Sequence, residues 1–133
     1  MNEPERAAGL APTPGYRYAR RVGQELYVAG QVPHDSTGRL VGEHDPYGQA
    51  VQCLHNLALL LQVHGFSLDD VQRLVIYVVG QRSGLSAAWK AVTERFSGQV
   101  PPATLLGVAC LGHEGQLVEM DATVIKSRDV HTT

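Results

Sequence analysis

Two carboxylates near the C-terminal end of the chain are the first residues whose types and spacing could do chemistry. Glu119 and Asp121 lie two positions apart in the segment LVEMD. On a strand they would share one face, opposite Val118, Met120 and Ala122, which suit a buried core. Paired carboxylates can act as a general acid/base unit in which one pKa is raised. They can equally form an exposed face, or a subunit interface satisfied by arginine or backbone donors.

The remaining polar residues match no established catalytic or metal-binding pattern. None of the histidines forms an HxH or HExxH pair; they are His34, His44, His55, His64, His113 and His131. His34 and His113 could approach the rim of a cleft, but we expect neither to be a catalyst. Cys53 and Cys110 lack CxxC spacing, so we interpret both as small buried hydrophobic residues. Because a P-loop, a GxSxG elbow and a dinucleotide fingerprint are also absent, we expect no cofactor and no metal.

Length and composition favour one ordinary globular domain. The chain has 133 residues, of which 44% are hydrophobic and 18% charged, and its formal net charge is −2. No basic excess is present to drive nucleic-acid binding by counterion release. The N-terminus has no basic and apolar leader, and no apolar run approaches the ~18 residues that span a bilayer. We therefore expect a cytoplasmic protein with neither nucleic-acid nor membrane partners.

The pattern along the chain predicts a domain over residues 16–126. Residues 1–15 are rich in proline, alanine and glycine without a period, which is typical of a flexible N-terminal arm. Residues 127–133 form a C-terminal tail. Segments 16–22 and 26–29 predict a β-hairpin around the turn Gly23-Gln24-Glu25. Gly30 to His44 is then a long polar loop.

Two helices and three further strands follow in the pattern. Asp45 and Pro46 predict an N-cap and a first helical residue, after which apolar residues recur at helical spacing as far as Gly65. A second amphipathic helix is indicated by Leu85, Ala88, Trp89, Val92 and Phe96. Strands are predicted over 74–79, 104–110 and 117–125. The order ββαβαββ is an α+β layout in which two helices cover one face of the sheet.

The strand over 74–79 also bears on assembly. Both its odd and its even positions are apolar. The apolar side chains on the face that the helices leave open must therefore be covered by another surface that excludes water. We expect a homo-oligomer. The alternative is that the N-terminal arm or the loop over 31–44 covers this face.

Five segments in order resemble the Rid/YjgF family, also called the YjgF/translation-inhibitor or L-PSP family. They are GQELYVAGQVPHDSTGRLVG, the helix that opens at Asp45, HGFSLDDVQRLVIYVV, PPATLLGVACL and LVEMDATVI. The match covers residues 15–126. The resemblance implies a chorismate-mutase-like fold with a mixed sheet, and a homotrimer with three clefts between subunits.

The resemblance also implies a site for a small molecule. Archetypal members hydrolyse enamines and imines from amino-acid metabolism, with an arginine that holds the substrate carboxylate and a glutamate that activates water. The glutamate position falls on Glu119, but the arginine position falls on Ala103, so the carboxylate clamp is missing unless Arg17 or Arg20 replaces it. The implied substrate-binding residues are Tyr16, Ala29, Gly30, Trp89, Ala103, Thr104 and Leu105.

Several of these positions are more apolar than the family pattern. A serine that often precedes the Gly-Gln pair becomes Ala29, an asparagine becomes Trp89, and a small residue becomes Leu105. Trp89 also fits the apolar stripe of its helix and would be a core residue on that pattern alone. Tyr16 is equally plausible as a strand residue with no special role.

Three functions remain open at the level of sequence. The first is a hydrolase of imines or enamines that lack the usual carboxylate. The second is a pathway-specific enzyme of a biosynthetic cluster that uses the same cleft for another acid/base step. The third is a non-catalytic, ligand-binding regulatory trimer.

Overall fold

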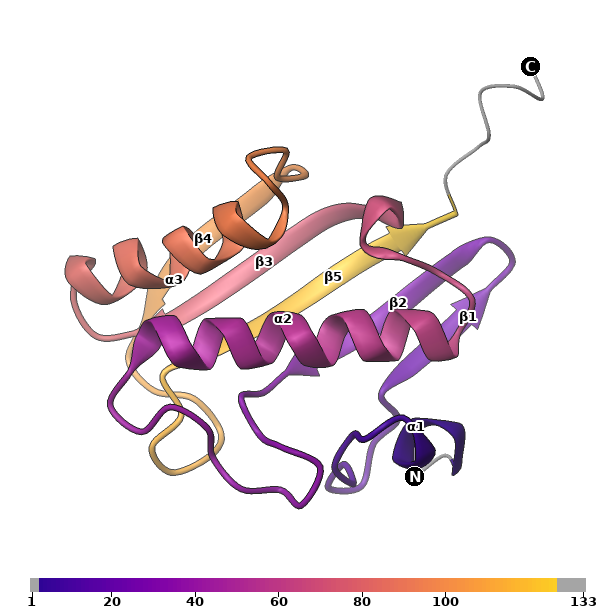
Figure 1. Ribbon diagram of the computed structural model, residues 1–133, viewed down its shortest axis with the longest axis horizontal. Helices are drawn as coiled ribbons and strands as arrows, with labels where there is room; N and C mark the ends of the chain where they lie inside the picture. The colour runs from indigo at the N-terminus through magenta and orange to yellow at the C-terminus, as the bar shows by residue number, and fades with distance from the viewer. Residues whose placement is uncertain (1–2, 127–133) are drawn as a thin grey trace.

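The computed structural model describes residues 3–126, which form a five-stranded mixed sheet and two long helices (Figure 1). The strands are β1 (Ala19–Val22), β2 (Glu25–Gln31), β3 (Val71–Val79), β4 (Ala103–Val108) and β5 (Val118–Ile125). The helices are α1 (Glu3–Ala7), α2 (Pro46–Val63) and α3 (Arg82–Arg95), and the 3-10 turn η1 spans Leu68–Asp70. Apart from α1 and η1, this is the predicted ββαβαββ order, and the α+β fold class is confirmed.

The strands lie in the order β1-β2-β5-β3-β4. β3 and β4 run parallel and are joined through α3, as a parallel pair requires a crossover, whereas the other neighbouring pairs are antiparallel. Both α2 and α3 lie on the same face of the sheet (Figure 1). The core fills the space between them and includes Leu57, Ile76 and Met120, all fully buried.

The longest helix, α2, begins and ends close to the predicted signals. Pro46 stands in its first turn, where the missing N–H has no helical partner to lose. Asp45 precedes it, but its side chain makes no capping hydrogen bond. After the helix Gly65 adopts φ 82°, and Phe66 N–H bonds back to the Leu61 carbonyl at 2.8 Å. Within residues 3–126, no helix is both long and apolar enough to cross a membrane.

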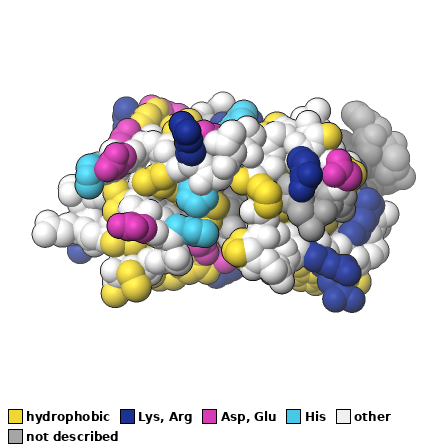
Figure 2. Space-filling model, turned by 90° about the horizontal axis from the view of Figure 1, so that it is seen from below, with side chains coloured by type: hydrophobic (Ala, Val, Ile, Leu, Met, Phe, Trp, Pro, Cys, Tyr) yellow, Lys and Arg dark blue, Asp and Glu magenta, His cyan; other side chains and the backbone are white. Residues whose placement is uncertain are grey.

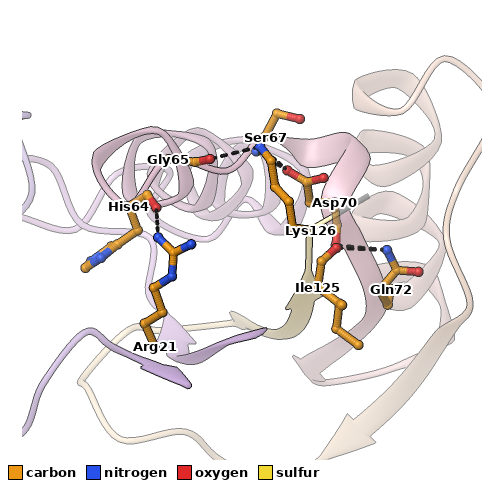
Figure 3. A network of polar contacts seen from close by, with 8 residues as sticks. All are labelled: Arg21, His64, Gly65, Ser67, Asp70, Gln72, Ile125 and Lys126. Atoms are coloured by element: carbon orange, nitrogen blue, oxygen red, sulfur yellow. Dashed lines mark hydrogen bonds and ion pairs between the residues drawn. The ribbon is translucent and has the colours of Figure 1, made fainter. Parts of the chain in front are cut away.

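The C-terminal end of α2 is held by two basic side chains, one on β1 and one directly after β5 (Figure 3). Arg21 Nη1 donates to the His64 carbonyl at 3.4 Å, and Lys126 Nζ donates to the Gly65 carbonyl at 3.1 Å. Lys126 also pairs with Asp70 at 3.7 Å. The helix has no basic residue in its own last turn, so these cations compensate the partial negative charge there. They tie α2 to the hairpin and to the end of β5.

The two faces of the sheet differ sharply in cover. On β3, Leu74, Ile76 and Val78 are fully buried under the helices. The alternate residues Val75, Tyr77 and Val79 are partly exposed on the other face. That open face also carries the exposed apolar side chains Val22, Tyr27, Leu106 and Ile125. Polar side chains of β5, Glu119, Asp121 and Thr123, lie between these apolar residues. Exposed apolar side chains gathered on one sheet face are typical of an interaction site.

The N-terminal segment differs from the expected flexible arm. Residues 3–7 form α1, and Leu10 and Ala11 are buried, with Leu10 in the main core cluster. The buried Glu5 accepts a hydrogen bond from His64 Nε2 at 3.0 Å. This segment packs against α2, so it does not cover the open face of the sheet. The predicted tail 127–133 and His131 lie outside the described residues.

Leu10→Ala tests whether the N-terminal segment belongs to the folded domain. Removing a buried leucine side chain typically costs about 2–5 kcal/mol, and Leu10 is only 3% exposed. We expect a loss of about 2 kcal/mol or more in the free energy of unfolding, measured by urea denaturation. The control is Val51→Ala, at a side chain that is 45% exposed on α2, away from the open face. Equal stability of the two variants would contradict the packing.

Candidate functional site

The predicted catalytic glutamate lies against Gly30, at a position where any other residue would make its carboxylate move. The register of β2 with β5 shifts between Val28 and Gln31, and Ala29 and Gly30 lie in this irregular stretch. A Cβ atom on residue 30 would stand 2.3 Å from Glu119 Oε2 and 2.7 Å from its Cδ, closer than real Cβ atoms approach. The absence of a side chain at Gly30 therefore makes the room that the Glu119 carboxylate occupies.

A buried glutamine holds the other oxygen of the same carboxylate. Gln116 Nε2 donates to Glu119 Oε1 at 3.1 Å and to the Val118 carbonyl at 3.1 Å. The Gln116 oxygen accepts from the His113 backbone N–H at 3.2 Å. Gln116 is only 3% exposed, whereas Glu119 is half-buried on the open face, paired with Tyr77. Glu119 is thus fixed from both sides while part of it still reaches solvent.

The two cysteines have opposite environments. Cys53 lies fully buried on α2, with its Sγ 3.7 Å from the Val118 carbonyl. Burial, and then the charge of Glu119, raise the pKa of this thiol well above its usual value. Cys53 is therefore an inert core residue, as predicted. The same prediction is wrong for Cys110, which is exposed.

Two tyrosines precede β1, and the first of them, Tyr16, lies near Glu119. Burial, and then the charge of Glu119, raise the pKa of Tyr16. Burial, and then the neighbouring Tyr16 and Glu5, raise the pKa of Tyr18 to about 12. The Tyr18 hydroxyl donates to the Ala11 carbonyl. A cavity of about 30 Å³, enough for a water molecule or two, is lined by residues that include Tyr16, Tyr18 and Gly30.

His34 and His113 meet on the wall of this cavity. Their rings pack edge to face with centroids 4.7 Å apart and an interplanar angle of 72°. Burial, and then His113, lower the pKa of His34, while Asp35 acts in the opposite direction. In Figure 2, histidine side chains gather near the centre of the lower face, with acidic side chains around them. Among the described residues, no cluster of three or more His, Cys, Asp and Glu side chains could hold a metal ion.

The remaining predicted site residues lie at the other edge of the sheet. Ala103 and Leu105 pair with Leu74 and Ile76, which places them on the helix-covered face. Trp89 on α3 is half-buried, and all three pack against the core cluster. Trp89 therefore packs against the core on one side and is partly exposed to solvent on the other.

Thr104 faces the opposite way from its two neighbours. It lies on the open face, where its Oγ1 accepts from Arg73 Nη2 at 3.2 Å. Arg20, suggested as a substitute for the missing arginine, is exposed on β1, at the sheet edge opposite β4. Within one chain, Arg20 does not replace the charge that is missing at Ala103.

The site residues thus form two half-sites, one around β2 and the central strand β5, the other on the edge strand β4 and on α3. The first, called here the glutamate half-site, contains Tyr16, Ala29, Gly30 and Glu119. The second, called the tryptophan half-site, contains Trp89, Ala103 and Leu105. β2 and β4 are separated by β5 and β3, and three strand spacings amount to about 14 Å. A single chain does not bring the two half-sites together.

The paired carboxylates of the sequence have separate partners. Asp121 Oδ2 accepts from the Tyr77 hydroxyl at 2.7 Å, whereas Glu119 bonds Gln116. The hydrogen bond to Asp121, followed by burial, raises the pKa of Tyr77. This arrangement supports different roles for the two carboxylates, with Asp121 as a structural partner of β3.

Sequence reasoning missed the polar residues that support Glu119 and the histidines. Gln116 precedes Glu119 by three positions in a turn, and Asn56 is a polar residue on the apolar face of α2. Asn56 Nδ2 donates to the carbonyls of Val32 and His34, both at 2.9 Å. A buried asparagine in an otherwise apolar helix face is a usable signal, because such an amide must find partners.

Comparisons with known proteins place the chain in one family. The family model for endoribonuclease L-PSP matches residues 7–126. A RutC family protein of Pyrococcus horikoshii is 30% identical over 119 residues, covering 87% of this chain and 92% of the relative. The solved structure of YyfA, a Rid family protein of Yersinia pestis, has a TM-score of 0.77 at 27% identity, covering 86% of this chain and 92% of that one. RidA from a Psychrobacter species has a TM-score of 0.77 at 25% identity, with coverage of 86% and 93%. The chain belongs to the Rid/YjgF family, which confirms the resemblance.

Gly30→Ala tests the close approach of Glu119. The new Cβ must displace the carboxylate, and because a flexible side chain can turn away we expect a cost of about 1 kcal/mol, at the low end for overpacking. The added change Glu119→Ala should remove the clash, so the two costs should not add in a double-mutant cycle of thermal unfolding. Gly112→Ala is the control, since no atom lies within 4 Å of its Cβ position. Strict additivity of the two changes would contradict the contact.

Proposed function

We propose that this protein binds a small neutral imine or enamine in clefts between the subunits of a homotrimer and hydrolyses it. The observation that carries the proposal is the placement of Glu119, with one oxygen on Gln116 and the other over Gly30. A carboxylate held in this way, at a half-buried position, is suited to accept a proton from a water molecule. Glu119 is the catalytic residue in this proposal.

Assembly is part of the proposal because Glu119 lies on the open face of the central strand β5, whereas Ala103 and Leu105 lie on the helix-covered face of the edge strand β4. A neighbouring subunit can bring its tryptophan half-site against the glutamate half-site of the first. The uncovered apolar face of the sheet supports such an assembly, since it contains Val75, Tyr77 and Val79 and has no cover from the described part of the same chain. Family membership makes the trimer the form we propose.

The tryptophan half-site favours an uncharged substrate. Ala103 offers a methyl group where the family resemblance places an arginine, and Leu105 and Trp89 add apolar surface. A carboxylate buried beside these residues would lose its hydration without gaining a cationic partner. A flat, neutral molecule can instead stack on the indole ring.

Light scattering tests the assembly. We expect a particle of three times the 14.4 kDa chain mass at micromolar concentration. Leu106→Glu puts a charge on the open face and should weaken the assembly. Val51→Glu is the matched control, because Val51 is similarly exposed but lies on α2, away from that face. A monomeric wild type would overturn the trimer.

A coupled assay tests the chemistry and the substrate class. An oxidase that releases imines supplies either an imino acid from a small amino acid or the neutral imine of an aromatic amine. We expect wild type to speed decay of the neutral imine, and Glu119→Gln to lower that rate by about a hundredfold or more. The imino acid should be handled about 10 to 100 times less well than the neutral imine, because a charge-assisted bond is worth ~1.5–3 kcal/mol.

Ala103→Arg is the companion variant in the same assay, and it should gain activity on the imino acid. Wild-type preference for the imino acid would contradict the proposed substrate class. Tight binding of a neutral ligand without turnover would favour the non-catalytic regulatory trimer. Turnover of a neutral metabolite without release of ammonia would favour the pathway-specific enzyme.

A further inference from the structure

We propose that His34, paired with His113, is a second proton-transfer group of the same site and protonates the amine nitrogen as ammonia leaves. This inference rests on the proposed imine hydrolysis. It goes against the expectation from sequence that neither histidine is a catalyst. The observations behind it are the cavity that both rings line, their mutual contact, and their links to the residues that hold Glu119.

The position of His34 is fixed by buried partners. Its backbone carbonyl accepts from Asn56 Nδ2 at 2.9 Å and from Gln52 Nε2 at 3.3 Å. Its backbone also forms an isolated bridge with Leu40. The loop that carries His34 is thereby fastened to α2, so the ring is presented to the cavity by a rigid support.

His113 is connected to the glutamate half-site through one residue. Its backbone N–H donates to Gln116, and Gln116 donates to Glu119. Gly30, which lines the cavity with both histidines, is also the residue against which Glu119 lies. Gly30 thus borders both the cavity and the Glu119 carboxylate, and in this proposal the amine end of a ligand held at Glu119 points toward the histidine pair.

The chemistry needs a second group because hydrolysis moves protons at two atoms. Glu119 takes a proton from water as the water oxygen adds to the C=N carbon. The electron pair of the C=N π bond moves to nitrogen, which takes the proton from Glu119, and the product is a carbinolamine that carries a hydroxyl and an amine. In its collapse Glu119 takes the hydroxyl proton as the C=O bond forms. The C–N bond breaks, its electron pair stays on nitrogen, and the protonated ring of His34 gives nitrogen a proton, so that ammonia leaves. The proton on Glu119 then returns to His34, and the net reaction is imine plus water to carbonyl compound plus ammonia.

The surroundings of His34 set the pH at which it can act. Burial and His113 lower the pKa of His34, so the ring is a stronger acid than a free histidine. A catalytic acid must be protonated, so activity should fall as pH rises above this lowered pKa. Replacing His113 removes part of the lowering, and the alkaline fall should then move to higher pH. The titratable groups around the ring are His113, Asp35, Tyr16, Tyr18 and, behind Gly30, Glu119.

The test compares three variants with wild type on the neutral imine. We expect His34→Asn to lower kcat by about a hundredfold with little change in KM. We expect His113→Asn to lower kcat less and to shift the alkaline limb of the pH profile upward. His44→Asn is the control and should match wild type, since His44 is exposed in the same loop and its φ of 59° suits asparagine.

A second measurement needs no turnover. In NMR titration of the ligand-free protein, the pKa of the His34 ring should lie below that of an ordinary histidine and should rise in His113→Asn. Wild-type kcat and pH profile in His34→Asn, with Glu119→Gln inactive, would overturn this inference and leave the proposed function standing. Independent titration of the two rings would also overturn it. A wild type with no activity on any imine would overturn both proposals.

Discussion

The contact between the Glu119 carboxylate and the backbone at Gly30 is the constraint on which the rest of the site depends. A strand residue with any side chain at position 30 would occupy the space of the carboxylate. The irregular register of β2 with β5 places that glycine beside β5, and Gln116 holds the second carboxylate oxygen from the adjoining turn. Because Gly30 has no Cβ, the Glu119 carboxylate can lie against the backbone of β2 instead of extending freely from the open face of the sheet.

The arrangement of the sheet keeps the glutamate half-site and the tryptophan half-site apart within one chain. With α2 and α3 on one face, β3 buries Leu74, Ile76 and Val78 and leaves its alternate residues partly uncovered. The strand order also puts Ala103 on an edge strand, separated from Gly30 by β5 and β3. The proposed assembly would cover the open face and bring β4 of one subunit to β2 and β5 of another. In the proposed cleft, the apolar character of the tryptophan half-site would select against charged molecules, because an unpaired buried charge is costly.

The fold was predictable from the sequence to a large extent. Along most of the chain the hydrophobic periodicity agrees with the proline and glycine residues that mark the ends of helices and strands. Pro46 and Gly65 bracket α2, and the alternation in LVEMD gives the two faces of β5 correctly. The N-terminal segment was not predictable, since Leu10 and Ala11 are too few apolar residues to show a period, and their burial depends on the distant α2. Glu119 could be named from sequence, but Gln116 and the His34–His113 contact could not. They arise where the loop after β2 meets the turn before β5, a tertiary contact that no local pattern encodes.

The most direct measurement is a crystal structure of the protein soaked with a flat aromatic amide, a stable neutral substitute for an imine. We predict density for the amide between two subunits, with its carbonyl end at Glu119 of one subunit and its ring against Trp89 of the other. The Glu119 carboxylate should remain over Gly30. A Glu119 side chain turned away from Gly30, or an amide bound elsewhere while the clefts between subunits stay unoccupied, would contradict the role assigned to this carboxylate.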